Sequence, residues 1–229
     1  MRERLATVRQ RIGQAALQAG RQPGEITLIG VSKFFTAEKA IAAVNLGLAD
    51  LGENRVQEML PKIEQLARLD LHPRWHLIGT LQKNKVRQVI GRVHLIHSAD
   101  SMALLAEINQ RSIMAGLVSE VLIQVNTAGE ITKHGFEPEQ LADAVEQVLQ
   151  MPGILLRGLM TMAPLLENPD ETLPIFSQTR ELFCQISKHV AQHPDFNVLS
   201  MGMSHDYLQA IRCGATHVRI GTAIFGPRL

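Results

Sequence analysis

The chain has 229 residues, and 45% of them are hydrophobic, which allows one large domain or two small ones around a sizeable core. Its formal net charge of +1 argues against a global field that would recruit nucleic acid or an acidic membrane surface. The two cysteines, Cys184 and Cys213, lack CxxC spacing, which argues against a metal site or a disulfide scaffold, so we expect buried free thiols in a cytoplasmic protein.

The predicted elements begin with an amphipathic helix over residues 2–19, whose mixed charges are not those of a secretory signal. No apolar run reaches the length of a membrane span. Eight short apolar runs predict buried strands at residues 26–31, 49–51, 75–78, 94–96, 118–125, 154–160, 198–201 and 217–220. Apolar residues at three-to-four spacing predict core-facing helices at residues 37–48, 101–115 and 138–149.

Alternating strands and helices predict an α/β fold with a parallel sheet. Eight such units in a chain of 229 residues fit a (β/α)8 barrel better than an open doubly wound sheet, which stays the alternative. No linker or low-complexity tract divides the chain, so we predict a single domain over residues 1–229. The longest loops are expected at residues 126–136 and 161–173. We see no exposed apolar stripe and therefore expect a monomer.

Lys33 follows the first predicted strand, and Thr36 begins the next helix. Functional groups of a barrel gather at the carboxyl ends of its strands, which is where Lys33 is placed. A desolvated lysine loses its proton more easily, and a neutral amine can form a Schiff base with a carbonyl compound. The alternative is a lysine whose stem covers apolar surface while its ammonium group reaches water.

The segments after the last two predicted strands can form a phosphate site. Gly202-Met203-Ser204 is predicted to begin one helix, and Gly221-Thr222 to begin a final helical turn. Backbone N–H groups at two helix starts, together with the Ser204 and Thr222 hydroxyls, can hold a dianion. The alternative is that Ser204 and Thr222 are simple helix N-caps.

Three further polar residues stand at or near predicted strand ends. Arg219, on the last strand, needs an acceptor if it lies inside the barrel, and it is either an ion-pair member or a contact to a ligand's ring nitrogen. Asn54 is either a helix N-cap or a ligand contact. His76 is more typical of a satisfied core histidine than of a catalyst. No zinc-type histidine spacing, GxSxG or phosphate-binding P-loop is present.

In these residues the chain resembles the pyridoxal phosphate homeostasis proteins, the YggS/PROSC group. The resemblance covers about residues 1–227. It rests on the segments VSK (31–33), GENRVQE (52–58), WHLIGTLQKNK (75–85), GLMTM (158–162), LSMGMS (199–204) and VRIGTAIFG (218–226). Leu77, Thr80 and His205 depart from the usual pattern of the family, which affects only local packing and the rim of the pocket.

The resemblance implies a TIM barrel of the alanine-racemase N-terminal-domain type (PLP fold type III) with an extra N-terminal helix, binding pyridoxal 5'-phosphate (PLP, a vitamin B6 form) as an internal aldimine. The residues implied to hold the cofactor are Lys33 for the aldimine, Ser204, Gly221 and Thr222 for the phosphate, Arg219 for the pyridine nitrogen, and Asn54, His76 and Met203 nearby. An arginine at that nitrogen disfavours its protonation and makes the ring a weaker electron sink.

The family implies a non-catalytic carrier that limits free PLP, hands it to PLP enzymes lacking their cofactor, and is tied to amino-acid and keto-acid balance. Racemases of this fold carry a second domain and a partner tyrosine, whereas this chain ends at Leu229 and has only Tyr207, so we expect no racemase activity. Two alternatives stay open. One is a racemase- or decarboxylase-like PLP enzyme using His76, His205 or Lys33. The other is a cofactor-free Schiff-base aldolase.

Overall fold

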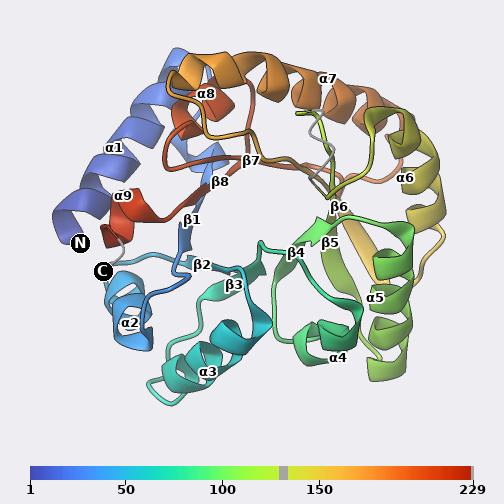
Figure 1. The fold of residues 1–229 in the computed structure, drawn as a ribbon, viewed down its shortest axis with the longest axis horizontal. Helices are drawn as coiled ribbons and strands as arrows, with labels where there is room; N and C mark the ends of the chain where they lie inside the picture. The colour runs from blue at the N-terminus through green and yellow to red at the C-terminus, as the bar shows by residue number, and fades with distance from the viewer. Residues whose placement is uncertain (129–133, 228–229) are drawn as a thin grey trace.

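The computed structural model describes residues 1–128 and 134–227, whose parallel strands close into a barrel ringed by helices (Figure 1). The strands are β1 (Thr27–Val31), β2 (Asp50–Glu53), β3 (Arg74–Leu77), β4 (Leu95–Ala99), β5 (Ser119–Gln124), β6 (Ile154–Met160), β7 (Val198–Met203) and β8 (His217–Ile220). The α-helices are α1 (Arg2–Gln18), α2 (Ala37–Asn45), α3 (Val56–Ala67), α4 (Val86–Val89), α5 (Met102–Ala115), α6 (Leu141–Leu149), α7 (Leu173–His189), α8 (Tyr207–Arg212) and α9 (Thr222–Phe225). Short 3-10 helices are η1 (Pro23–Glu25), η2 (Lys83–Lys85), η3 (Pro138–Gln140) and η4 (Pro169–Thr172).

The predicted barrel is confirmed, and the open sheet is wrong because β1 pairs with β8 from Thr27 to Gly30. Each predicted strand overlaps an observed one. The helix expected over residues 37–48 ends at Asn45, because Gly47 turns the chain with a φ of 80°. The helix expected over residues 138–149 begins as the 3-10 turn η3. The expected loop at 126–136 includes residues 129–133, which lie outside the described residues.

Successive side chains of each strand point alternately outward and into the barrel, so the buried apolar side chains form two separate clusters. Side chains such as Ile96, Ile123 and Leu159 point outward and pack with the helices in one large cluster. The intervening side chains point into the barrel, where Leu95, Leu122, Met160 and Val198 form a second, smaller cluster. These four belong to β4–β7. The interior also holds buried polar side chains, namely Asp50, His76, His97, Ser200 and Arg219.

Helix α1 packs against α8 and α9, beside the end of the described chain (Figure 1). Its buried residues recur at helical spacing: Leu5, Val8, Ile12, Ala15 and Ala16. Arg4 Nε donates to the carbonyl oxygen of Ile224 over 2.9 Å, which ties α1 to the last helical turn. The extra N-terminal helix is therefore part of the layer that surrounds the barrel.

Two expectations about the surface are wrong. Cys184 and Cys213 are half-buried free thiols and not buried ones, and Cys213 is the C-cap of α8. The chain also exposes neighbouring apolar side chains at the end of α5 and in the following turn, namely Ile113, Met114, Leu117 and Val118. None of the described helices combines the length and hydropathy that crossing a bilayer requires.

Candidate functional site

Four neighbouring strands, β7, β8, β1 and β2, carry most of the predicted site at their carboxyl ends. The parallel register places Met203 of β7 beside Arg219 of β8, and Val31 of β1 beside Gly52 of β2. The predicted residues on these strand ends and the loops that follow are Lys33, Asn54, Met203, Ser204, Arg219, Gly221 and Thr222. The fold therefore gathers seven of the eight predicted residues into one sector, with His76 on the next strand, β3.

Lys33 lies in a tight turn, two residues past the end of β1. Its side chain is half-buried, less than predicted, and its Nζ lies 5.9 Å from the centroid of the Phe34 ring. Phe34 has a φ of 66°, which is rare for a residue with a bulky side chain. Such a conformation persists where its surroundings impose it, so the turn fixes the position from which Lys33 extends.

A buried ion pair holds the backbone just before Lys33. Ser32 Oγ donates to Glu53 Oε1 over 2.6 Å, and Lys62 Nζ donates both to this oxygen and, over 2.8 Å, to the Ser32 carbonyl oxygen. Burial raises the pKa of Glu53, and the hydrogen bonds from Lys62 and Ser32 offset only part of that effect. Sequence reasoning missed Lys62. The feature that could have identified it is a lysine among the apolar positions that form the buried face of α3.

We expect Lys62→Met to lower the free energy of unfolding by about 3–5 kcal/mol, because it leaves the buried Glu53 carboxylate without its cation. Urea denaturation measures this loss. The double variant Glu53→Leu with Lys62→Met removes both charges and should recover most of the stability. A single variant as stable as the wild type would mean that the pair does not hold this turn.

The loops after β7 and β8 meet at Ser204 and Gly221. The Gly221 backbone N–H donates to Ser204 Oγ over 3.1 Å. Thr222 is exposed at the start of α9, where the first N–H groups of the helix have no partner within the helix. A Cβ added to Gly221 would approach the Val31 carbonyl oxygen to 3.3 Å, so this glycine allows the loop to lie close against the end of β1. Hydroxyl and backbone donors thus converge beside the strand that carries Lys33.

The predicted helix starts at these loops are partly wrong. Strand β7 continues to Met203, and α8 begins at Tyr207 with Asp206 at its N-cap, so Ser204 lies in the turn between them. The reason is that Asp206 Oδ1 accepts a 2.6 Å hydrogen bond from the Met203 N–H, which closes the turn later than expected. Thr222 is the first residue of α9, and its N-cap is Gly221. Neither Ser204 nor Thr222 is therefore an N-cap.

Arg219 is 3% exposed and points into the barrel interior. It donates through Nη1 to Ser200 Oγ and through Nη2 to the Thr161 carbonyl oxygen, the latter over 2.8 Å. Within the described residues no carboxylate lies within 4.0 Å of it. Burial lowers the pKa of Arg219 to about 10, although the Asp206 charge opposes the shift. Of the two predicted roles, the direct ion pair is not observed in the described part of the chain.

His76 is 1% exposed and satisfies the prediction of a core histidine with partners. Its Nε2 lies 2.9 Å from Asp50 Oδ1, and its Nδ1 lies 2.9 Å from Nε2 of His97. Burial lowers the pKa of His76, and the nearby Asp50 carboxylate only partly opposes this. Its ring is therefore directed at other interior side chains, toward the amino end of β2. His97 in turn contacts Ser200, which contacts Arg219.

Asn54 is half-buried directly after β2 and is not a helix N-cap, because Arg55 occupies that position of α3. Gly79 lies against it, so closely that an added Cβ would be 2.5 Å from the Asn54 carbonyl oxygen. The loop after β3 thereby reaches Asn54, whose side chain stays available for a ligand.

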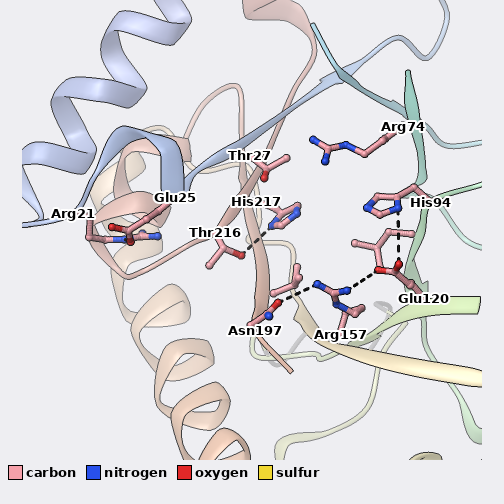
Figure 2. A pocket seen from close by; sticks show the side chains of 12 residues that line it. Arg21, Glu25, Thr27, Arg74, His94, Glu120, Arg157, Asn197, Thr216 and His217 are labelled. Carbon is pink, nitrogen blue, oxygen red and sulfur yellow. Dashed lines mark hydrogen bonds and ion pairs between the residues drawn. The ribbon is translucent and has the colours of Figure 1, made fainter. Parts of the chain in front are cut away.

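A polar pocket of about 430 Å³ lies at the opposite, amino end of the barrel. Figure 2 shows Arg74, His94, Glu120, Arg157 and His217 around it, which come from β3, β5, β6 and β8 and from the residue before β4. Arg157 Nη1 donates to Glu120 Oε2 over 3.1 Å, while its buried Nε has no hydrogen-bond partner among the described residues. Sequence reasoning gave no indication of this pocket, since its residues come from separate strands. The described residues contain no cluster that could hold a metal ion.

Known proteins and a known family match this chain over almost its whole length. The family model described as alanine racemase, N-terminal domain, matches residues 7–228, which confirms the predicted type of barrel. A pyridoxal phosphate homeostasis protein of Aquifex aeolicus is 46% identical over 230 residues, covering 99% of this chain and 97% of the relative. The protein of that name from Pseudomonas aeruginosa is 40% identical over 227 residues, covering 99% and 95%.

One solved structure is informative about ligands. PipY of Synechococcus elongatus, with PLP bound, is 35% identical and superposes with a TM-score of 0.83. The match covers 98% of this chain and 99% of PipY.

Proposed function

Since the chain belongs to the family of pyridoxal phosphate homeostasis proteins, we propose that it binds PLP at the carboxyl end of its barrel and serves PLP homeostasis. The observation that carries this proposal is the PLP-bound structure of PipY, which matches nearly the whole chain at 35% identity. We propose that residues 1–229 form one PLP-binding domain.

Three groups in the described chain fit PLP. Lys33 extends from a fixed turn beside β1 and supplies an amine. Ser204, Gly221 and Thr222 place hydroxyl and backbone N–H donors together, which suits the phosphate dianion. Arg219 supplies a cationic donor that is 3% exposed and suits a ring nitrogen acceptor.

Each group has a distinct task in the proposed site. Lys33 would hold the cofactor through its amine, and PLP, when bound, would supply the aldehyde that reacts with amines. Asn54 and Met203 line the same end of the barrel and would contact the cofactor. Both ring nitrogens of His76 are engaged with other interior side chains, so His76 would help to position Arg219 and would not contact the cofactor itself.

We propose that the bound state is a reservoir and not a catalytic cycle. The relatives are named as homeostasis proteins. Tyr207, the one tyrosine of the chain, is buried in the core at the start of α8, which does not suit a proton donor for substrate. His205 Nε2 lies 2.8 Å from the Leu166 carbonyl oxygen, so its ring is also engaged. The carrier would hand PLP to enzymes that lack it and so influence amino-acid and keto-acid balance.

Adding PLP to the purified chain tests this function. We expect a stable visible absorbance band at one PLP per chain, and then a stoichiometric spectral change with D- or L-amino acids without turnover. Sustained racemisation or decarboxylation would instead support a PLP enzyme. A chain that takes up no PLP would refute the proposed function outright.

A further inference from the structure

A continuous set of hydrogen bonds crosses the barrel interior from the amino end toward the proposed cofactor site. At the amino end, Arg74 Nε and Nη2 donate to the two carboxylate oxygens of Asp50 over 2.8 and 2.7 Å. His76 Nε2 lies 2.9 Å from Asp50 Oδ1, and the Asp50 side chain is almost fully buried. Arg74 itself is exposed and lines the pocket in Figure 2.

The carboxyl half of this set ends at Arg219. His97 Nε2 lies 2.9 Å from His76 Nδ1, and His97 Nδ1 lies 2.9 Å from Ser200 Oγ, which accepts from Arg219 Nη1. His97 and Ser200 are both 0% exposed. We call the whole set the polar relay; its members are Arg74, Asp50, His76, His97, Ser200 and Arg219.

The proton positions in the polar relay follow from its chemistry. The pKa of Asp50 is below its ordinary value because hydrogen bonds from His76 and Arg74 outweigh the effect of burial, so Asp50 is ionised and only accepts. His76 must therefore donate through Nε2 and, as a neutral ring, accept at Nδ1. By the same reasoning His97 donates through Nε2 and accepts at Nδ1.

Ser200 links His97 to Arg219 and fixes the direction in which the hydrogen bonds donate. Its hydroxyl proton must point to His97 Nδ1, which leaves the Ser200 oxygen free to accept from Arg219. From Arg219 through Ser200, His97 and His76, every hydrogen bond thus donates toward Asp50, to which Arg74 donates from the other end. Neither ring can turn or change tautomer without breaking a neighbour's bond. The buried Arg219 cation is thus connected to the buried Asp50 carboxylate by the neutral side chains between them.

We propose that the polar relay positions Arg219 for the cofactor ring, so that Asp50, at the opposite end of the barrel, helps to set how PLP is bound. This inference rests on the proposed function. Arg219 touches the ring in that site, while Asp50, His76, His97 and Ser200 act through it as positioning residues.

Simple filling of the core does not account for this arrangement. Four other side chains of the same interior are apolar, namely Leu95, Leu122, Met160 and Val198, so apolar residues can fill space inside this barrel. Burying histidines, a hydroxyl and a charged carboxylate costs free energy that apolar residues would not. A polar set whose members are all paired is stiff, which is what a positioning role requires.

Asp50→Asn is the sharpest test, because it is nearly isosteric and lies far along the polar relay from Arg219. The amide can keep its oxygen toward His76 Nε2 and Arg74 Nε, but it presents an N–H to Arg74 Nη2 and removes the negative charge to which the polar relay donates. Without that charge the tautomers of His76 and His97 are held less strongly, and so is the Ser200 proton on His97. We expect PLP to bind about tenfold more weakly, a change of about 1.4 kcal/mol, with a shifted visible absorbance maximum.

Glu120→Gln is the matched control. Glu120 lies at the same end of the barrel but pairs with Arg157, outside the polar relay. It should leave PLP affinity and the spectrum unchanged. If Asp50→Asn behaves like the wild type, or both variants shift alike, the proposal is overturned. Should Asp50→Asn fail to fold, His97→Leu replaces it, with His217→Leu as control, since these rings are only 6.5 Å apart and His217 bonds Thr216 instead.

Imidazole ¹⁵N NMR of the protein without PLP separates this inference from the proposed function. We expect neutral Nε2–H tautomers at His76 and His97 in the wild type and a larger share of Nδ1–H tautomers in Asp50→Asn. Nδ1–H tautomers or charged rings in the wild type would overturn the polar relay, whether or not PLP binds. The expected tautomers in a chain that takes up no PLP would instead refute the proposed function and leave the hydrogen-bond order intact.

Discussion

Lys33→Ala is expected to abolish the visible absorbance that the wild-type chain develops with PLP, while leaving the fold intact. The band depends on a covalent bond between the lysine nitrogen and the aldehyde carbon, and alanine offers no amine. Lys33 is half-buried in a surface turn, so its loss creates no buried cavity. Absorbance spectra of the two proteins at equal PLP concentration measure the effect.

Lys39→Ala is the control for this experiment. Lys39 is an exposed lysine on α2, six residues further along the chain, and can react with free PLP only as any surface amine does. It should keep the wild-type band. Full absorbance in Lys33→Ala, or its loss in Lys39→Ala, would contradict the proposed site. A weakened phosphate contact, by contrast, would lower affinity without removing the band at saturation.

Acidification should destabilise the protein strongly between about pH 6.5 and pH 5. Burial lowers the pKa of His217 to about 3, and it also lowers the pKa of His76 and, further, that of His97. The unfolded chain protonates these rings near the ordinary value of 6.5, whereas the folded chain keeps them neutral, so stability is lost as the pH falls. The His217 ring alone contributes about 1.4 kcal/mol per pH unit, and His76 and His97 add to the loss with the same sign.

Two buried carboxyl groups change the free energy of unfolding in the opposite direction at lower pH. Burial raises the pKa of Glu53 and Asp206, so their protonation favours the folded state as the pH falls toward their ordinary values, and the slope should flatten there. Urea unfolding at several pH values measures the slope. His217→Leu should make the slope shallower. A free energy of unfolding that is constant over this range would contradict neutral, buried histidines.

The sequence predicted the fold well because the periodicity of apolar residues depends on local geometry. The eight apolar runs and the amphipathic N-terminal segment each correspond to an observed element. Helix starts were less accurate: Asp206 captures the Met203 N–H through its side chain, so α8 begins later than the glycine at 202 suggested. Such a choice among nearby caps is decided by tertiary packing, which a single sequence does not display.

The site was predictable in part for the same reason. Strand ends can be read from the sequence, so Lys33, Ser204 and Gly221 could be placed at one end of the barrel. The contacts between strands could not. His97 and Ser200 are 103 residues apart, and nothing marks Asp50, in the middle of the short run 49–51, as an interior residue. Only the closure of the barrel brings these residues together.

Borohydride reduction of the PLP-loaded chain, followed by peptide mapping, tests the central claim most directly. Reduction converts the carbon–nitrogen bond into a stable amine and so fixes the cofactor on the residue that held it. We predict one pyridoxyl group per chain, on the peptide that contains Lys33. A pyridoxyl group on another lysine, or labelling spread over several surface lysines, would contradict the proposed site.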